Sequence, residues 1–180
     1  EAMELETDLI LEGLSHYKAM PGRSNIVAGI KRSILIDDTY NAAPLSMIEA
    51  LHLLSRFPQE NKVGVLGDML ELGDETDSSH EEVGKLVQSL NLRKLVTVGE
   101  LGKKIASAAQ SAGMASENIV SFNNSEEAKR QVLSTLEPES VILIKGSQGA
   151  RMEKITKELL AEPTAATHLL VRQYGKWLES

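Results

Sequence analysis

The sequence contains no cysteine, which excludes both a disulfide framework and a thiolate catalytic or metal site. Aromatic residues make up only 3% of the 180 residues, so a hydrophobic core has to be built from aliphatic side chains. No apolar run approaches the roughly 18 residues that a membrane span requires, and the first residues lack a signal-peptide pattern. We therefore expect a soluble, cytoplasmic protein without a membrane span.

Positive charge is also scarce, because 19 Lys and Arg stand against 26 Asp and Glu, for a net charge of -7. A surface that follows nucleic-acid phosphates needs a clustered excess of Lys and Arg, so we expect no nucleic-acid partner. A single nucleotide is compatible with this composition, since a few backbone N–H groups and one or two cations can hold it. The length suits one domain with an appendage, and a first residue of Glu rather than Met suggests a piece of a longer protein.

Short β-type runs alternate with amphipathic helical segments from residue 24 onward. The expected strands are residues 24–27, 33–37, 62–66, 94–98, 118–122 and 140–145, and the expected helices are about 45–57, 79–90, 101–112, 126–136 and 151–160. This alternation predicts an α/β protein with a Rossmann-like, mostly parallel sheet of about six strands flanked by helices. The VILI run at 141–144 has no polar alternation, which predicts the doubly covered middle of the sheet.

The two ends of the chain differ from this pattern. Residues 1–20 are expected to be mostly helical and to precede a breaker at Pro21-Gly22. The main domain is then expected at 21–162, followed by an amphipathic C-terminal tail at 163–180 that we expect to be helical. Two helix starts are predicted from pairs that are spaced as capping boxes or close variants: Ser78 with Glu81, and Asn124 with Glu127.

Residues 33–47 form the most informative stretch, because in a parallel sheet the residues after the strands emerge at the edge where open α/β proteins bind ligands. An apolar strand ends there in Asp37 and Asp38, a turn with Asn41 follows, and Pro44 suits the first turn of a helix. A strand-end Asp can accept two hydrogen bonds from a ribose diol, and an Asn can pair with an adenine edge. The structural alternative is that Asp38 and Asn41 only cap the helix.

A second group at the same edge is LGDMLELG, residues 66–73. We expect its Met and Leu side chains to fold onto the protein and Asp68 and Glu71 to project, with Asp68 as a candidate ligand-binding acid. The alternative is a solvated acidic face before a helix N-terminus. His80 is expected to be a surface or capping residue. No second His lies at metal-ligand spacing, so no metal site is predicted.

The third group is KGSQGAR, residues 145–151. Lys145 ends an apolar strand, and Ser147 and two glycines precede a new helix. A point charge, a hydroxyl and free N–H groups together favour an anion. The alternative is a plain strand-to-helix turn with Lys145 in a surface ion pair.

Several motifs together resemble one known family. They are PGR at 21–23, DDTYNAAP at 37–44, LGDMLELG at 66–73, HEEVG at 80–84 and KGSQGARME at 145–153. In this order and spacing they resemble the C-terminal domain of the Mur ligases, over about residues 1–160. The resemblance would make residues 1–20 the end of the central ATPase domain or a linker helix.

The resemblance implies an ATP-dependent amide ligase of peptidoglycan synthesis, which uses ATP and Mg²⁺ to add D-Ala-D-Ala to UDP-MurNAc-tripeptide. By the family pattern three residues serve the nucleotide and three lie near the dipeptide: Arg23, Asp38 and Asn41, and Asp68, Lys145 and Ser147. The phosphate loop, the Mg²⁺-binding residues and the carbamylated lysine belong to the family's central domain. The N-terminal and central domains are therefore implied partners, and this chain alone is expected to be inactive.

The sequence departs from the family pattern at two points. Ala43 stands where the family turn has a second Asn, so one polar contact or cap is missing. Gln148 stands where Arg is common, which changes the charge available to the dipeptide carboxylate. Two other functions remain open at this point: a non-catalytic α/β nucleotide-binding or interaction module, and a Mur-type ligase with another substrate, such as a polyglutamylating ligase.

Overall fold

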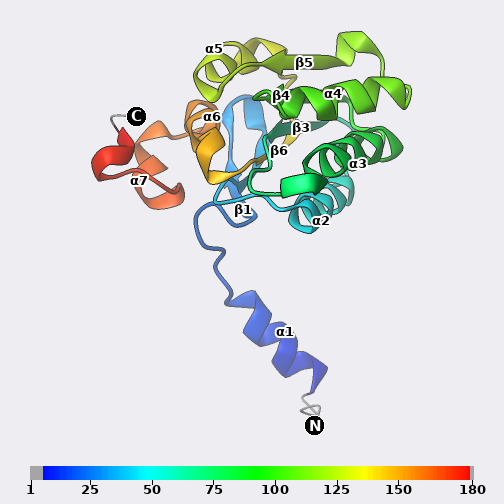
Figure 1. Ribbon diagram of the computed structural model, residues 1–180. Helices are drawn as coiled ribbons and strands as arrows, with labels where there is room; N and C mark the ends of the chain where they lie inside the picture. The colour runs from blue at the N-terminus through cyan, green and yellow to red at the C-terminus, as the bar shows by residue number, and fades with distance from the viewer. Residues whose placement is uncertain (1–5, 179–180) are drawn as a thin grey trace.

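The structure, a computed structural model, describes residues 6–178 and contains a central sheet with helices on both faces (Figure 1). The strands are β1 (Asn25–Ala28), β2 (Ile34–Asp38), β3 (Lys62–Gly67), β4 (Lys94–Val98), β5 (Ile119–Phe122) and β6 (Val141–Lys145). They lie in the order β1-β2-β6-β3-β4-β5, and every neighbouring pair is parallel except β1 with β2. The predicted α/β fold with six mostly parallel strands is confirmed.

Strand β6 lies inside the sheet, between β2 and β3, and all five of its residues are buried. Ile142 and Ile144 belong to the core on one face of the sheet, whereas Val141 and Leu143 belong to the core on the other. Successive side chains of a strand point to opposite faces, so an unbroken apolar run serves two cores at once. The predicted central position of this run is confirmed.

Helices complete the two cores. On one face lie α2 (Pro44–Ser55), α3 (Thr76–Ser89) and α4 (Gly102–Ser111), and on the other lie α5 (Ser125–Thr135) and α6 (Glu153–Leu159). Their buried residues are almost all aliphatic, such as Leu51 and Val87 on the first face and Val132 and Ile155 on the second. Both cores are therefore packed from aliphatic side chains, as the low aromatic content of the chain predicts.

The predicted helix start at Asn124 is confirmed as a close variant of a capping box, in which the Glu127 carboxylate accepts the Asn123 N–H at 2.8 Å. The Asn124 side chain accepts a hydrogen bond from the Glu127 N–H at 2.9 Å, directly before α5. The other box is wrong, because α3 begins at Thr76 and the Ser78 hydroxyl instead donates to the Glu75 carbonyl.

The prediction of a surface or capping role for His80 is also wrong. Position 80 lies three and seven residues before the buried Val83 and Val87, so it falls on the inner face of α3, and the side chain is fully buried. Its Nδ1 donates to the Thr76 carbonyl at 2.6 Å, and its Nε2 accepts the Met69 N–H at 3.0 Å. His80 therefore fastens the loop after β3 to α3.

Gly84 marks the close approach of α3 and α4, and its replacement by alanine is expected to lower the free energy of unfolding by about 2 kcal/mol. A Cβ at this position would overlap the Ile105 carbonyl oxygen and lie 2.9 Å from the Ala109 nitrogen, so the two helices would have to separate. Urea denaturation measures the effect. Gly13→Ala is the control, because nothing lies within 4 Å of a Cβ there. Equal stability of Gly84→Ala and the wild type would contradict this account of the packing.

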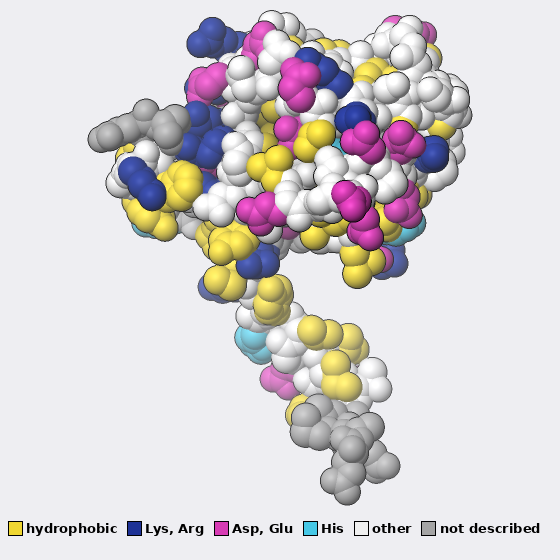
Figure 2. All heavy atoms as spheres, in the orientation of Figure 1, with side chains coloured by type: hydrophobic (Ala, Val, Ile, Leu, Met, Phe, Trp, Pro, Cys, Tyr) yellow, Lys and Arg dark blue, Asp and Glu magenta, His cyan; other side chains and the backbone are white. Residues whose placement is uncertain are grey.

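The ends of the chain contain short helices. Helix α1 (Thr7–Ser15) is shorter than the helix expected for residues 1–20, of which 1–5 lie outside the described residues. It buries no residue and projects away from the sheet, with apolar side chains visible along it (Figures 1 and 2). The tail forms three short helical pieces, Pro163–Ala165, α7 (Ala166–Leu169) and Gly175–Leu178. Among residues 6–178, no helix combines the length and apolar character that crossing a bilayer demands.

Candidate functional site

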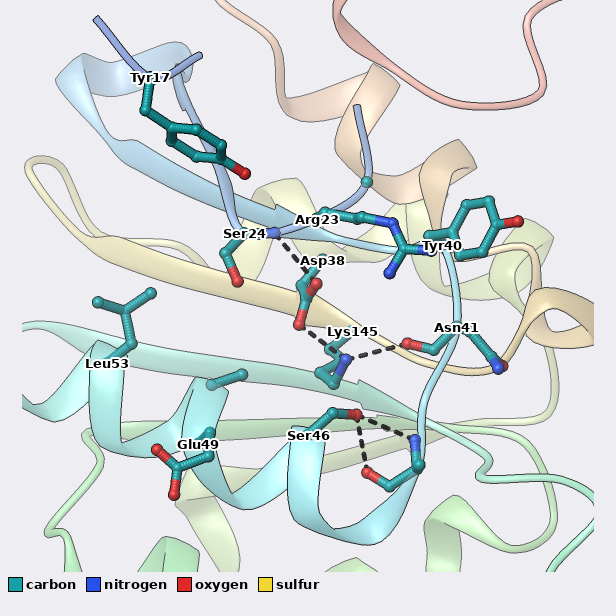
Figure 3. Close-up of a pocket in the computed structure, with 13 residues that line it drawn as sticks. Tyr17, Arg23, Ser24, Asp38, Tyr40, Asn41, Ser46, Glu49, Leu53 and Lys145 are labelled. Carbon is teal, nitrogen blue, oxygen red and sulfur yellow. Dashed lines mark hydrogen bonds and ion pairs between the residues drawn. The ribbon is translucent and has the colours of Figure 1, made fainter. Parts of the chain in front are cut away.

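A cavity of about 630 Å³ opens at the carboxyl ends of β2 and β6, between α2 and the segment that leads into β1 (Figure 3). Four of the six predicted site residues line it, namely Arg23, Asp38, Asn41 and Lys145. The other lining residues are Tyr17, Gly22, Ser24, Tyr40, Ala43, Ser46, Glu49, Ala50 and Leu53. The structure therefore brings the three predicted nucleotide ligands together with one of the predicted dipeptide ligands.

Asp38 and Lys145 form the centre of the cavity floor. The Lys145 ammonium lies 2.7 Å from Asp38 Oδ2 and donates to the Asn41 carbonyl at 2.9 Å, while Asp38 Oδ1 accepts the Ser24 N–H at 3.0 Å. The side chain of Lys145 is only 2% exposed and that of Asp38 is 14% exposed. The surface ion pair considered for Lys145 is thus wrong. Its charge is buried, is balanced by Asp38, and holds the β2 turn against β6.

Neither Asp38 nor Asn41 caps α2. The N-cap is Ala43, which has no side-chain acceptor, and Ser46 compensates: its hydroxyl accepts the Ala43 N–H at 3.1 Å and donates to the Ala43 carbonyl at 2.9 Å. Pro44 takes the first helical position, as expected. The missing family Asn is therefore a lost cap, and Asp38 and Asn41 are not used for capping.

Asp37 differs from its neighbour because it is fully buried. Its carboxylate accepts hydrogen bonds from the Gly22 N–H at 2.9 Å and from the hydroxyls of Thr39 and Thr156 at 2.9 and 3.0 Å. Burial raises the pKa of Asp37 to about 6, although these hydrogen bonds oppose the shift. Asp37 is a structural acid, and of the two adjacent carboxylates only Asp38 lines the cavity.

Arg23 lies at the rim of the cavity, with its guanidinium 4.3 Å from the centre of the Tyr40 ring. Stacking of this kind uses the face of the guanidinium and leaves its N–H edge for an anion. The Tyr40 N–H donates to the Gly22 carbonyl at 3.0 Å, and this backbone hydrogen bond places Tyr40 beside Arg23, the residue after Gly22. Gly22 has a φ of +70°, and a Cβ there would lie 2.9 Å from Val171 Cγ1, so glycine is needed at this crossing.

Asp68 and Ser147 do not line the cavity. The Asp68 carboxylate accepts the Gly102 N–H at 2.7 Å at the start of α4, and the Asp68 carbonyl accepts the Ser147 N–H at 2.8 Å. Asp68 is half-buried, and this burial raises its pKa. The Ser147 hydroxyl is buried without a hydrogen-bond partner among the described residues. These two residues form a second polar group beside the cavity, and their role near a dipeptide stays a prediction.

The side-chain directions predicted for LGDMLELG are only partly right. Met69 is fully buried and Glu71 is exposed, as expected. Asp68 turns onto α4 instead of projecting, because the α4 N-terminus offers it an N–H donor. Leu70 is 43% exposed rather than folded onto the protein.

The α2 wall of the cavity was not predicted from the sequence; it consists of Ser46, Glu49, Ala50 and Leu53. Their spacing of three and four residues on a helix that follows the Asp38 turn was an available signal. Tyr17 and Ser24 had no such signal, since their place depends on how the N-terminal segment crosses the sheet edge.

A protein-family model described as "Mur ligase, glutamate ligase domain" matches residues 22–148 of this chain. The matched residues include the turn after β2, the LGDMLELG loop and β6. The chain belongs to the Mur ligase family. The matched region is the C-terminal domain of these ligases, as the motif order predicted, and all four predicted residues of the cavity lie within it.

Several Mur ligases are similar to this chain. The UDP-N-acetylmuramoyl-tripeptide--D-alanyl-D-alanine ligase of Escherichia coli (strain K12) is 31% identical over 154 residues, 84% of this chain and 32% of that protein. The enzyme of the same name from Rickettsia prowazekii is 36% identical over 137 residues, 74% of this chain and 29% of that protein. The chain thus spans about a third of the length of the curated relatives that it matches.

Solved Mur ligases share the fold. A crystal structure of MurF from Acinetobacter baumannii has a TM-score of 0.72 and 30% identity over 88% of this chain and 34% of that one. MurF from Thermotoga maritima, solved in complex with ADP, has a TM-score of 0.66 and 24% identity over 83% of this chain and 35% of that one, a likeness of fold.

Proposed function

We propose that this chain is the C-terminal domain of an ATP-dependent ligase that adds D-Ala-D-Ala to UDP-MurNAc-tripeptide. In this proposal the domain closes over the bound nucleotide. The observation that carries the proposal is the single cavity that gathers Arg23, Asp38 and Asn41 at the carboxyl end of β2. This is where open α/β sheets bind ligands. The substrate assignment follows the names of the E. coli and R. prowazekii relatives.

The residues of the cavity suit the three parts of ATP. Asp38 is partly exposed and each of its oxygens keeps a lone pair beyond its present partner, so it can accept the ribose hydroxyls. The exposed Asn41 amide can donate and accept at an adenine edge. Arg23 offers a planar edge of N–H donors to phosphate oxygens. Lys145 then acts as a positioning residue, because it holds Asp38 and the Asn41 backbone together.

We also propose that residues 1–20 belong to the end of the central ATPase domain or to a linker, and that residues 21–162 form the C-terminal domain, with 163–180 as its tail. The exposed Ile10, Leu11 and Leu14 of α1 support this division, since they share one helix face and an apolar face that is not buried in its own domain suits a neighbouring one.

Mg²⁺ is implied by the family. Among residues 6–178, no three His, Asp or Glu side chains converge as a metal site requires. We therefore propose that Mg²⁺ is held by the ATP phosphates and by another domain, and we assign none of its chemistry to the cavity. The proposed substrates also support a cytoplasmic enzyme, because ATP and UDP-linked precursors are intracellular metabolites.

Asn41→Ala is expected to weaken ADP binding by about five- to tenfold without changing stability, because an exposed amide that pairs with adenine contributes about 1 kcal/mol. An NMR titration of the 180-residue chain with ADP measures the affinity, and urea denaturation measures the stability. Gln110→Ala, an exposed amide on α4, is the matched control. An unchanged ADP affinity in Asn41→Ala would remove Asn41 from the nucleotide site.

The substrate is tested with the full-length parent enzyme. ATP-dependent phosphate release with UDP-MurNAc-tripeptide is expected with D-Ala-D-Ala and not with glutamate, while the 180-residue chain alone is expected to release none. Release with glutamate would favour a polyglutamylating ligase. No release from the parent with either amine, together with ADP binding, would favour a non-catalytic nucleotide-binding module.

A further inference from the structure

We infer that Arg172, in the C-terminal segment after α7, is a positioning residue for the turn that follows β2. Its side chain is 6% exposed, and its guanidinium reaches back more than 130 positions along the chain. Nη1 donates to the Thr39 carbonyl at 3.0 Å, and Nη2 donates to the Tyr40 carbonyl at 2.6 Å. Both carbonyls belong to the backbone between the proposed ribose-binding and adenine-binding side chains. The inference rests on the proposed function for its effect on nucleotide affinity.

The charge of Arg172 is compensated where it is buried. Glu153 of α6 is fully buried, and its Oε2 accepts from Arg172 Nη1 at 3.0 Å. The other oxygen of Glu153 accepts from Arg151 Nε at 2.6 Å. A guanidinium can serve two carbonyls and a carboxylate simultaneously because its donors are fixed in one plane, whereas a lysine ammonium cannot match this fork. The site is thus built for arginine.

The C-terminal segment is itself anchored, which allows Arg172 to act as a fixed support. Leu170 is buried in the core, and the Leu169 carbonyl accepts from Asn25 Nδ2 at 3.2 Å beside β1. The Trp177 ring lies 5.7 Å from the Arg172 guanidinium, and the Trp177 carbonyl accepts from Arg151 Nη2 at 2.6 Å. Contacts before and after Arg172 therefore hold the segment in place.

Besides the Lys145 ammonium, which donates to the Asn41 carbonyl, two further supports hold the turn after β2. The Tyr40 N–H bonds to the Gly22 carbonyl on the N-terminal side, and the carbonyls of the turn bond to Arg172 on the C-terminal side. Without Arg172 the turn would keep the Tyr40 bond to Gly22 and the Lys145 bond to the Asn41 carbonyl, and it would lose two charge-assisted bonds. Its local opening would then become more frequent, and the turn would have to be ordered again when a nucleotide binds.

Arg172→Met and Arg172→Lys test the inference, with the exposed Arg130→Met as the matched control. Amide hydrogen exchange is measured first, without nucleotide. In Arg172→Met we expect exchange at Tyr40 to rise at least about tenfold while β6 amides stay unchanged. An NMR titration with ADP follows, and we expect about tenfold weaker binding for Arg172→Met and an intermediate loss for Arg172→Lys. Arg130→Met should match the wild type in both measurements.

Three outcomes decide the question. Faster exchange confined to the turn, with weaker ADP binding, supports the inference. Unchanged exchange at Tyr40, or a uniform rise across the whole sheet with unchanged ADP affinity per folded molecule, overturns it and leaves Arg172 as a general stabilising residue. If the wild-type chain binds no ADP, the proposed function fails at this site, and the exchange measurement still decides whether Arg172 holds the turn. Should Arg172→Met not fold, Arg172→Lys carries the same comparison.

Discussion

Replacement of Lys145 by methionine is expected to lower the free energy of unfolding by about 3 kcal/mol, because it leaves a mostly buried carboxylate without its counter-charge. Asp38 would keep only its bond from the Ser24 N–H, and the Asn41 carbonyl would lose its donor. The apolar stem of methionine fills the space of the lysine stem, so the loss reports the ion pair and its hydrogen bonds rather than a cavity. Urea denaturation at neutral pH measures it.

The matched control is Lys104→Met, which removes an exposed pair with Asp77 and is expected to cost less than about 1 kcal/mol. The double variant Lys145→Met/Asp38→Asn is expected to recover part of the lost stability, because it no longer buries an unpaired charge. A double variant no more stable than Lys145→Met would show that the loss does not come from the unpaired carboxylate of Asp38.

The second large effect concerns Asp37, whose carboxylate is expected to make the protein less stable as the pH rises. Its pKa is about 6 in the folded protein against an ordinary value of 3.8, so the folded state binds the proton more tightly than the unfolded state. The stabilisation from this proton is fully present below about pH 3.8 and is lost as the pH rises through about 6. Between pH 4 and 7.5 the loss amounts to about 2–3 kcal/mol.

Asp37→Asn isolates this effect, because the amide does not titrate and the other ionisable groups are common to both proteins. The stability of the wild type minus that of Asp37→Asn should fall by about 2–3 kcal/mol between pH 4 and 7.5, measured by urea denaturation at both values. Asp74→Asn, at an exposed aspartate, should show no such trend. A constant difference for Asp37→Asn across this range would mean that the Asp37 pKa is not raised.

The fold was largely predictable because its signals are local. The VILI run, the Asn124 cap and Pro44 each determine their own element, and each was predicted correctly. His80 was misplaced because it stands among acidic residues, although its spacing of three and seven residues to Val83 and Val87 puts it on the inner face of α3.

Apart from Arg23, which was predicted from the family pattern, the site was predictable only where its residues follow a strand. Asp38 and Lys145 end two adjacent parallel strands, so topology alone brings them together. Their mutual pairing was not predicted, because strand order along the sheet is not apparent from a single strand. Arg172 had no signal at all, since its partners lie in a turn that precedes it by more than 130 residues.

Helix α1 has nine residues and buries none of them. Isolated helices shorter than about 12–15 residues are marginal in water, so backbone hydrogen bonds alone sustain it poorly. A surface that covers Ile10, Leu11 and Leu14, which share one face and are 44%, 58% and 65% exposed, would raise its helical content. On the proposed division, in which residues 1–20 belong to the central domain or a linker, docking of that domain and folding of α1 would be one coupled equilibrium, and the helical content of α1 would report the docking.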